Sequence, residues 1–183
     1  ILASKLSKPV NILNETFNEL VESLQVRQDT EIAKEDVSFN DCLTKVLEIL
    51  NLDIVNHNIE IISDFEEAPR IIYPKKYLLS YLHNLVSNSI KYRSPERQLI
   101  INIKTYLKNG SIFLEVTDNG LGMDMKNNAS KLFGLRKTFH GNPDAKGFGL
   151  FITKTQVEAM NGTIYAESKV DTGSTFYIQF NKN

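Results

Sequence analysis

Apolar and polar residues alternate along the chain with two different periods, and these periods predict where helices and strands lie. In residues 10–28 apolar side chains recur at steps of three and four, the spacing that places them on one helix face. Residues 43–50 repeat that spacing behind a short strand-like segment, and Asn40 is the candidate N-cap of this second helix. The other predicted elements are strands at 58–65, 99–107, 111–118, 163–169 and 174–181 and helices at 74–92 and 148–161.

The order of these elements predicts an α+β fold. Helices and strands alternate over one shared core, and several strands follow one another as hairpins. We therefore expect a two-layer α/β sandwich with a mixed, mostly antiparallel sheet, plus an N-terminal helix. A charged break at residues 29–36 separates that helix from the rest, so we divide the chain into residues 1–33 and a domain of residues 34–183.

The balance of charges narrows the candidate functions. The 183 residues include 21 basic and 22 acidic ones, so no global field attracts nucleic acid or an anionic membrane. Cys42 is the single cysteine, which allows no internal disulfide and favours a reducing compartment, the cytoplasm. No apolar run reaches the length of a membrane span. A chain that opens on Ile1 is expected to be part of a longer protein, and whether that parent is membrane-anchored stays open.

The predicted helix at 74–92 carries polar residues of an unusual kind opposite its apolar side. Asn84, Asn88 and Lys91 fall on one side, with Tyr92 beside them. One interpretation is a solvated face. The other is a site in which an amide oxygen serves as a neutral ligand of Mg²⁺ and the lysine attracts phosphates.

A carboxylate ends the predicted strand at 111–118 on its apolar side. Asp118 continues the row of alternate apolar residues and is followed at once by Asn119, Gly120 and, two residues later, Gly122. An Asp-Asn-Gly sequence is a common turn former, which is one interpretation. The other is that the carboxylate accepts a hydrogen bond from an exocyclic amine while the glycines let the backbone approach a flat ring.

A long irregular segment at about 119–147 is longer than ordinary connections and is a candidate lid, with glycines at 120, 122, 141 and 147 where a lid would hinge. Two further stretches that contain glycine follow. Gly147 and Gly149 stand where this loop becomes a helix, an arrangement that turns free N–H groups toward an anion, although Gly149 could equally serve close packing. The sequence DTGSTF at 171–176 is typical of a turn that leads into the last strand.

In this order and spacing, these stretches resemble the ATP-binding domain of bacterial sensor histidine kinases, over residues 34–183. That domain is a branch of the superfamily that includes DNA gyrase, the Hsp90-type chaperones and the mismatch-repair ATPases. The resemblance implies ATP and Mg²⁺ as ligands. HNLVSNSIKY is similar to the N box, which implies Asn88 as the Mg²⁺ ligand, Asn84 in support, and Lys91 and Tyr92 at the phosphates and nucleotide.

The remaining motifs imply the rest of the nucleotide site. DNGLG is similar to the first glycine box, which implies that Asp118 takes the adenine amino group, while GSTF implies a position near the adenine for Ser174. KGFGLFITK resembles the second glycine box, although Ala145 stands where that box usually begins with glycine. The other implied nucleotide-binding residues are Gly120 and Gly122 at the base, Phe133 on the lid, and Gly147, Phe148, Gly149 and Leu150 at the phosphates.

Residues 1–33 resemble the second helix of the dimerisation and phosphoacceptor hairpin of these kinases. The phosphoacceptor histidine belongs on the preceding helix, and none of His57, His83 and His140 has the expected context. The resemblance therefore implies that no catalytic phosphoacceptor lies in this chain and that the hairpin of the same or a paired chain supplies it. The implied partners are that hairpin, a second copy in a full-length homodimer, and a response regulator receiver domain.

The residue at position 84 separates the candidate activities. In hydrolytic members of the superfamily, a glutamate that activates water stands four residues before the metal-binding asparagine, whereas here that position is Asn84, which cannot act as a base. We therefore expect a protein-histidine kinase domain. The alternatives are an ATP-hydrolysing clamp of the chaperone or gyrase type and a degenerate, non-catalytic docking module.

Overall fold

A computed structural model of the chain describes residues 32–129, 132–134 and 148–181. The predicted N-terminal helix at 10–28 lies outside this part of the chain, as does most of the candidate lid. Among the described residues, no helix is both long and apolar enough to cross a bilayer.

Five strands form the main sheet, in the spatial order β2, β4, β5, β7 and β6. Their bounds are Glu60–Asp64 for β2, Ile100–Lys108 for β4, Ser111–Asp118 for β5, Thr163–Lys169 for β6 and Gly173–Gln179 for β7. The pairing of β2 with β4 is parallel and the other three pairings are antiparallel. The prediction of a mixed, mostly antiparallel sheet is therefore confirmed.

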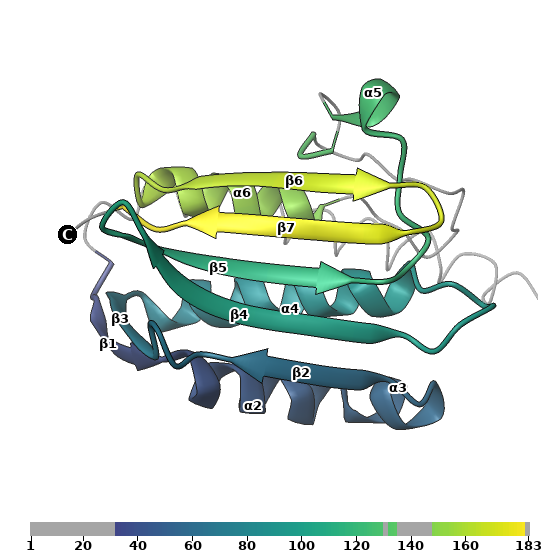
Figure 1. Cartoon of the computed structure of the whole chain (residues 1–183). Coiled ribbons are helices and arrows are strands. Elements are labelled where there is room, and N and C mark those ends of the chain that lie inside the picture. Colours follow the sequence, from purple (N-terminus) through teal and green to yellow (C-terminus); the bar gives the residue numbers. More distant parts are fainter. Residues whose placement is uncertain (1–31, 130–131, 135–147, 182–183) are drawn as a thin grey trace, which may run out of the picture.

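Helices cover one face of this sheet (Figure 1). The three long ones are α2 (Phe39–Ile49), α4 (Lys75–Lys91) and α6 (Gly149–Ala159). Short helices follow α2 and β5: α3 (Asn51–Asn56) and α5 (Met125–Asn128). The expected two-layer α/β sandwich is thus what the described part of the chain forms.

A tight turn joins the two longest strands. Lys108 of β4 pairs with Ser111 of β5, so only Asn109 and Gly110 lie between the strands. Both have positive φ angles, 53 degrees at Asn109 and 75 degrees at Gly110. Two consecutive positive φ angles are what a two-residue hairpin turn of this twist requires, and Asn-Gly is the sequence that adopts them most readily.

The start of α2 differs from the sequence-based expectation. Ser38, not Asn40, is the N-cap: its backbone is extended and its hydroxyl oxygen accepts a hydrogen bond from the Asp41 N–H at 3.2 Å. Asn40 lies inside the first turn, where its carbonyl accepts a bond from the Thr44 hydroxyl. The helix begins earlier because Phe39, at its first position, is fully buried. Serine and asparagine are about equally good caps, so burial of the neighbouring residue decided between them.

The structure also contains a second, smaller sheet. β1 (Glu35–Ser38) and β3 (Arg70–Tyr73) form a separate two-stranded antiparallel sheet. A short strand was predicted at β1, whereas the strand at β3 was not predicted. An exposed ion pair between Arg70 and Asp36, at 2.9 Å, links the two strands.

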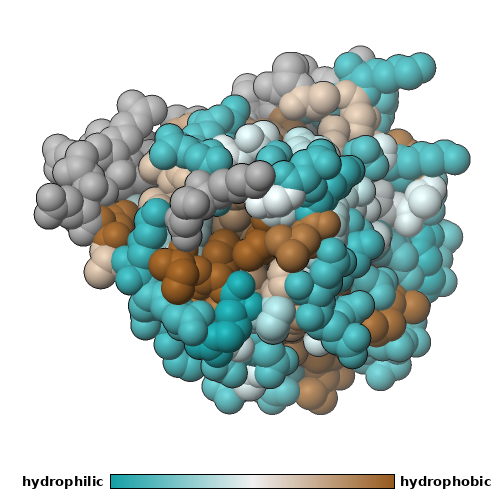
Figure 2. All heavy atoms as spheres, turned by 60° about the vertical axis from the view of Figure 1, so that its left-hand side comes forward, coloured by the Kyte–Doolittle hydropathy of each residue, from teal (hydrophilic) through white to brown (hydrophobic). Residues whose placement is uncertain are grey.

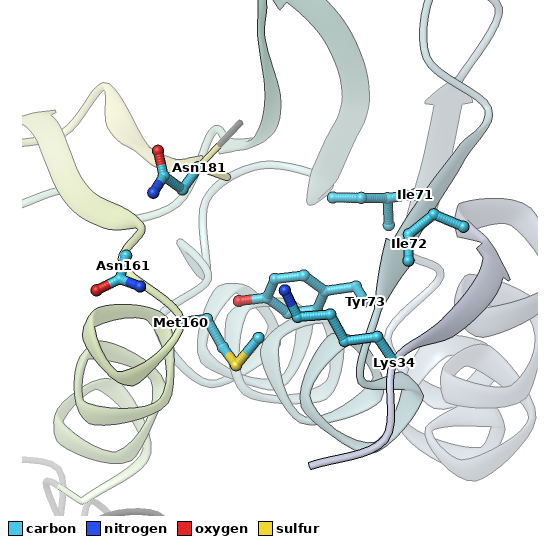
Figure 3. Close-up of a pocket in the computed structure, with 7 residues that line it drawn as sticks. All are labelled: Lys34, Ile71, Ile72, Tyr73, Met160, Asn161 and Asn181. Carbon is cyan, nitrogen blue, oxygen red and sulfur yellow. The ribbon is translucent and has the colours of Figure 1, made fainter. Parts of the chain in front are cut away.

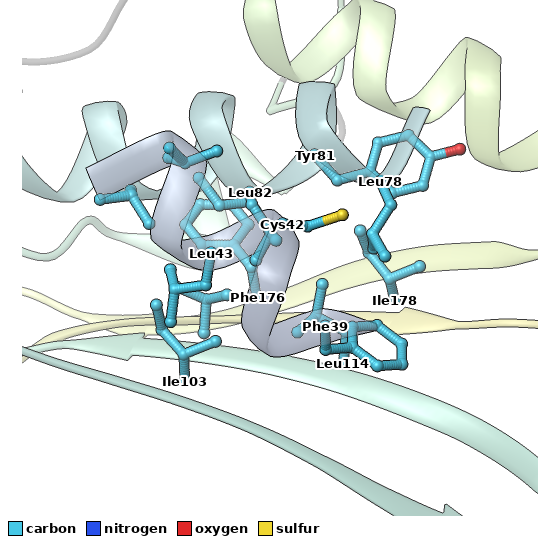
Figure 4. Packing of buried hydrophobic residues seen from close by; sticks show 14 of the residues in the cluster. Phe39, Cys42, Leu43, Leu78, Tyr81, Leu82, Ile103, Leu114, Phe176 and Ile178 are labelled. Atoms are coloured by element: carbon cyan, nitrogen blue, oxygen red, sulfur yellow. The ribbon is translucent and has the colours of Figure 1, made fainter. Parts of the chain in front are cut away.

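The core lies between the helices and the sheet (Figure 4). From the helices, Phe39, Leu78 and Leu82 point toward the sheet and are fully buried; from the sheet, Leu114 and Ile178 point back at them and are equally buried. Burial of one such side chain contributes roughly 1.5–3 kcal/mol. This packing fixes the orientation of β5 and α4, the elements that carry Asp118 and the three candidate residues Asn84, Asn88 and Lys91.

Surface hollows lie at the end of the sheet where β5 begins. A shallow groove of about 520 Å³ is lined by Ile72, Leu107 and Ile112, and Figure 2 shows apolar surface on this side of the molecule. A smaller pocket of about 140 Å³ adjoins it, where Tyr73 points from β3 toward Met160 at the end of α6 (Figure 3). The groove lies roughly 20 Å along β5 from Asp118, since Ile112 is six residues before it at about 3.3 Å per residue.

Candidate functional site

The carboxylate of Asp118 is the centre of the candidate site. It ends β5 on the helix-covered side of the sheet and is only 8% exposed, as the alternation along the strand predicts. Its Oδ1 accepts hydrogen bonds from the backbone N–H of Gly120 at 2.8 Å and of Ser174 at 3.3 Å. Its Oδ2 accepts a bond from the hydroxyl of Ser89 at 3.1 Å. Three donors, from α4, from β7 and from the loop after β5, therefore fix its orientation.

Burial and hydrogen bonding act on the Asp118 carboxyl in opposite directions. Desolvation raises its pKa above the ordinary value, and the bonds from Gly120, Ser89 and Ser174 offset part of this shift. An ionised carboxylate offers about four acceptor positions, of which the described residues use two on Oδ1 and one on Oδ2. One acceptor position on Oδ2 is thus left for a ligand donor, such as an exocyclic amine.

Glycines allow the backbone to close tightly around this carboxylate. A Cβ on Gly120 would stand 2.6 Å from the Tyr92 carbonyl oxygen and 2.8 Å from Oδ1 of Asp118. Gly173 has a φ of +128 degrees, and a Cβ there would overlap the backbone carbonyl of Asp118. Gly122 is similarly enclosed, against the Lys169 carbonyl. These positions accept no side chain without displacing the segments around Asp118.

Asn84 joins the two helices that flank the site. Its Nδ2 donates to the Gly149 carbonyl at 3.2 Å and to the Thr153 hydroxyl at 3.1 Å, both on α6. The interpretation of Asn84 as part of a solvated face is therefore wrong. Gly149 also packs closely here, since a Cβ on it would lie 3.3 Å from Oδ1 of Asn84. Close packing, one of the two interpretations of Gly149, is thus part of its role.

The other N-box residues lie further along α4. Asn88 is half-buried, and its carboxamide has no hydrogen bond to any other residue that the structure describes. Lys91 is half-buried too, with Nζ 6.0 Å from the centre of the Tyr92 ring. Tyr92 ends the helix, and its carbonyl accepts a bond from the Leu121 N–H at 2.9 Å. This bond connects the end of α4 to the loop after Asp118.

The start of α6 presents backbone donors. Phe148, buried at the N-cap position, makes no side-chain cap, and no acidic residue occupies the first turn of this helix. Leu150 and Phe133 are half-buried and pack against the hydrophobic core. Gly147 lies outside the described residues, as does Ala145. N–H groups at a helix start without a side-chain cap are suited to an anion.

Comparison with known proteins identifies the family. The model for "Histidine kinase-, DNA gyrase B-, and HSP90-like ATPase" matches residues 75–183, more than half of the chain. The chain belongs to this ATPase family. The match begins at α4 and includes every described element that supplies a donor or acceptor around Asp118.

The relatives of this ATPase-family chain include sensor kinases. It is 31% identical over 157 residues to the sensor protein RprX of Bacteroides fragilis, covering 83% of this chain and 30% of that protein. It is 29% identical over 180 residues to the sensor-like histidine kinase SenX3 of Mycobacterium tuberculosis, covering 96% of this chain and 43% of that protein. The chain therefore spans less than half the length of these curated relatives.

Solved structures share the fold of this ATPase-family chain. Full-length ShkA in complex with AMPPNP superposes with a TM-score of 0.80 at 19% identity, covering 97% of this chain and 37% of that one. The histidine kinase AdeS of Acinetobacter baumannii gives a TM-score of 0.77 at 19% identity, covering 100% and 84%. At this identity the likeness shows the fold alone.

Several residues around Asp118 were not singled out from the sequence of this ATPase-family chain. Ser89 follows Asn88 directly. It differs from the candidate residues of α4 in lying on the buried side of that helix. Thr153 and Gly173 stand within stretches that were already assigned, the second glycine box and the GSTF turn. Arg97, in the connection between α4 and β4, carries no sequence signal, because its partners are backbone carbonyls that any residue supplies.

Proposed function

We propose that this chain is the ATP-binding catalytic part of a sensor histidine kinase, which transfers the γ-phosphoryl group of Mg-ATP to a histidine outside the chain. The observation that carries the proposal is the buried carboxylate of Asp118, held by three donors with one acceptor position left on Oδ2. An adenine amino group is a donor that fits this position. The relative SenX3, named a sensor-like histidine kinase, supports the kinase assignment, and the relative RprX, named a sensor protein, supports the sensor assignment.

The base and the phosphates would meet different parts of the chain. Asp118 reads the adenine, with Ser174 and the enclosed glycines Gly120 and Gly122 shaping the pocket. At the other end, the start of α6, which has no side-chain cap among the described residues, and the half-buried Lys91 would attract the phosphates. Phe148, Gly149 and Leu150, at that helix start, would line the phosphate end, with Gly147 and Phe133 on the lid side.

The chain also offers a ligand for Mg²⁺. The Asn88 carboxamide, which has no hydrogen bond to another described residue, suits a hard cation that takes most of its ligands from phosphates and water. Among the described residues there is no cluster of three or more His, Cys, Asp or Glu side chains that could hold a metal by itself. When bound, the ion would neutralise charge on the triphosphate.

Catalysis by this chain would consist of positioning. Phosphoryl transfer needs the two reacting groups in line and the phosphate charge balanced, and little covalent participation by the protein. Asn84 supports this view, because its Nδ2 is engaged with α6 and an amide cannot take a proton from water. The phosphoryl group would pass to a histidine of the dimerisation hairpin, in the same or a paired chain, and then to a receiver domain in the cytoplasm.

Calorimetric titration with a non-hydrolysable ATP analogue tests the proposal. The wild-type chain should bind the analogue, Asp118→Asn should abolish binding, and Mg²⁺ should strengthen binding in the wild type but not in Asn88→Ala. In the full-length protein, Asn88→Ala should lose phosphohistidine formation. A folded wild type that binds no nucleotide would refute the proposal and favour a docking module. Steady-state hydrolysis by the isolated chain would favour an ATP-hydrolysing clamp.

A further inference from the structure

Arg97 holds the loop that follows β5, and the proposed ATP chemistry assigns it no task. Its Nε donates to the Asn119 carbonyl at 2.6 Å, and its Nη2 donates to the Gly120 carbonyl at 2.6 Å and to the Asp171 carbonyl at 3.0 Å. These are charge-assisted bonds from a half-buried guanidinium, and such bonds are about twice as strong as neutral ones.

The first of these bonds reaches the Asp118 carboxylate through a single peptide plane. The Asn119 carbonyl and the Gly120 N–H belong to one peptide unit, which is planar and trans. Arg97 holds the oxygen of this unit, and the N–H at its other end donates to Oδ1 of Asp118 at 2.8 Å. Rotation of the unit would break both bonds together. Arg97 therefore fixes the direction from which the carboxylate is held.

The second bond acts in the same way on the end of α4. The Gly120 carbonyl and the Leu121 N–H form the next peptide unit, whose oxygen Arg97 holds and whose N–H donates to the Tyr92 carbonyl at 2.9 Å. Two successive peptide planes thus connect one guanidinium to the base-reading carboxylate and to the helix that carries the N box.

The third bond ties the turn between β6 and β7 to the same loop. Its acceptor, the Asp171 carbonyl, lies 74 residues further along the chain, and the Asp171 N–H donates to the Leu121 carbonyl at 2.7 Å. This turn leads into Gly173 and Ser174, which contact Asp118. Arg97 is therefore bound to both segments whose N–H groups hold Oδ1.

We infer that Arg97 is a positioning residue for recognition of the nucleotide base, acting through the Asn119–Gly120 and Gly120–Leu121 peptide planes. The inference rests on the proposed function. A lysine cannot replace it fully, because a single ammonium group does not reproduce the planar fork that reaches three carbonyls. Without the Arg97 guanidinium, the Asp118 carboxylate stays buried but its orientation is no longer fixed. The chain should then discriminate less between a base that carries an amino group and one that carries a carbonyl group at the same position.

The test compares ADP and GDP binding to the full 183-residue chain by calorimetry and competition. Arg97→Gln should raise the Kd for ADP roughly tenfold, the effect of about 1.4 kcal/mol, and lower the ratio of the GDP and ADP Kd values. Arg97→Lys should fall between Arg97→Gln and the wild type. Arg70→Gln, which removes an exposed arginine bond on the separate two-stranded sheet, is the matched control and should change neither value.

Each outcome decides for or against the inference. An unchanged Kd and ratio in Arg97→Gln would overturn it, and so would equal increases in both Kd values, which would show a purely structural role. Should Arg97→Gln not fold, the Lys variant is used, with faster hydrogen exchange at the Gly120 and Leu121 amides as the expected result and unchanged exchange as the contrary one. Failure of the proposed function itself is distinguishable, because the wild type would then bind neither nucleotide.

Discussion

Removal of the Ser89 hydroxyl measures how strongly the Asp118 carboxylate is held. Ser89 is 3% exposed, and its hydroxyl lies 3.1 Å from Oδ2 of Asp118 and 3.2 Å from the Leu85 carbonyl. Ser89→Ala deletes one oxygen and leaves almost no cavity, so the free energy change reports the hydrogen bond alone. A bond to a buried charged group contributes about 1.5–3 kcal/mol. Because one proton is shared between two acceptors, we expect the lower part of this range.

The pH dependence separates this charge-assisted bond from ordinary packing. The Ser89 bond lowers the pKa of Asp118, so its deletion raises that pKa further above the ordinary value. Below the pKa the carboxyl is neutral and the bond from Ser89 is worth only about 0.5–1.5 kcal/mol. The destabilisation by Ser89→Ala should therefore be larger at pH 7 than at about pH 4.

Denaturant unfolding of the wild type, Ser89→Ala and Ser87→Ala at both pH values is the assay. Ser87 is the matched control, because it lies on the same helix and donates to the Asn84 carbonyl at 3.3 Å without contacting Asp118. We expect Ser87→Ala to cost under about 1 kcal/mol at either pH. The reasoning is refuted if the two variants show the same loss of stability, or if the loss in Ser89→Ala does not depend on pH.

Other substitutions test separate parts of the structure. Asn84→Ala should cost about 1–3 kcal/mol in unfolding free energy, because two bonds to α6 are lost; a cost no larger than that of Ser87→Ala would contradict this. Gly173→Ala should destabilise by more than about 1 kcal/mol and weaken ADP binding, since its Cβ would overlap the Asp118 carbonyl; wild-type stability and affinity would contradict it. Leu82→Ala, in the core, should cost about 2–5 kcal/mol without changing the ratio of GDP and ADP affinities. The pKa of Asp118 is raised in the folded state, so the contribution of this carboxyl to the free energy of unfolding is full below about pH 4, the pKa in the unfolded chain, and is lost as pH rises through the folded pKa. Asp118→Asn should remove this decline in stability with rising pH in unfolding experiments. A pH profile of stability that is the same in the variant and the wild type would count against the shift.

The parts of the site that a local period governs were predictable from the sequence. The alternation along β5 placed Asp118 on the buried side, and the 3.6-residue period of α4 placed Asn84 and Asn88 away from the core stripe. Both results follow because a strand or helix fixes the direction of its side chains whatever lies around it. The strand order, and the parallel pairing of β2 with β4, did not follow from any local pattern.

The parts that depend on distant backbone atoms were not predictable. Arg97 bonds to carbonyls 22 and 74 residues away, and a carbonyl has no residue type for a sequence pattern to detect. The position of Asn84 against α6 likewise depends on how two helices pack. The N-cap of α2 went to Ser38 because the burial of Phe39 set the first helical position.

The two-residue turn at Asn109 and Gly110 bears on the order in which the domain folds. β4 and β5 need to close only this shortest of loops, so their pairing carries a small entropic cost and can form within microseconds. β2 and β4, in contrast, are separated along the chain by β3 and α4, so their pairing has to close a much longer loop. We therefore expect the β4–β5 hairpin, which ends in Asp118, to form early. The hydrogen bonds from Ser89 and Ser174 to the Asp118 carboxylate should form later, because these residues belong to α4 and β7. Ligand recognition in this domain is thus expected to appear last during refolding, after most of the sheet is in place.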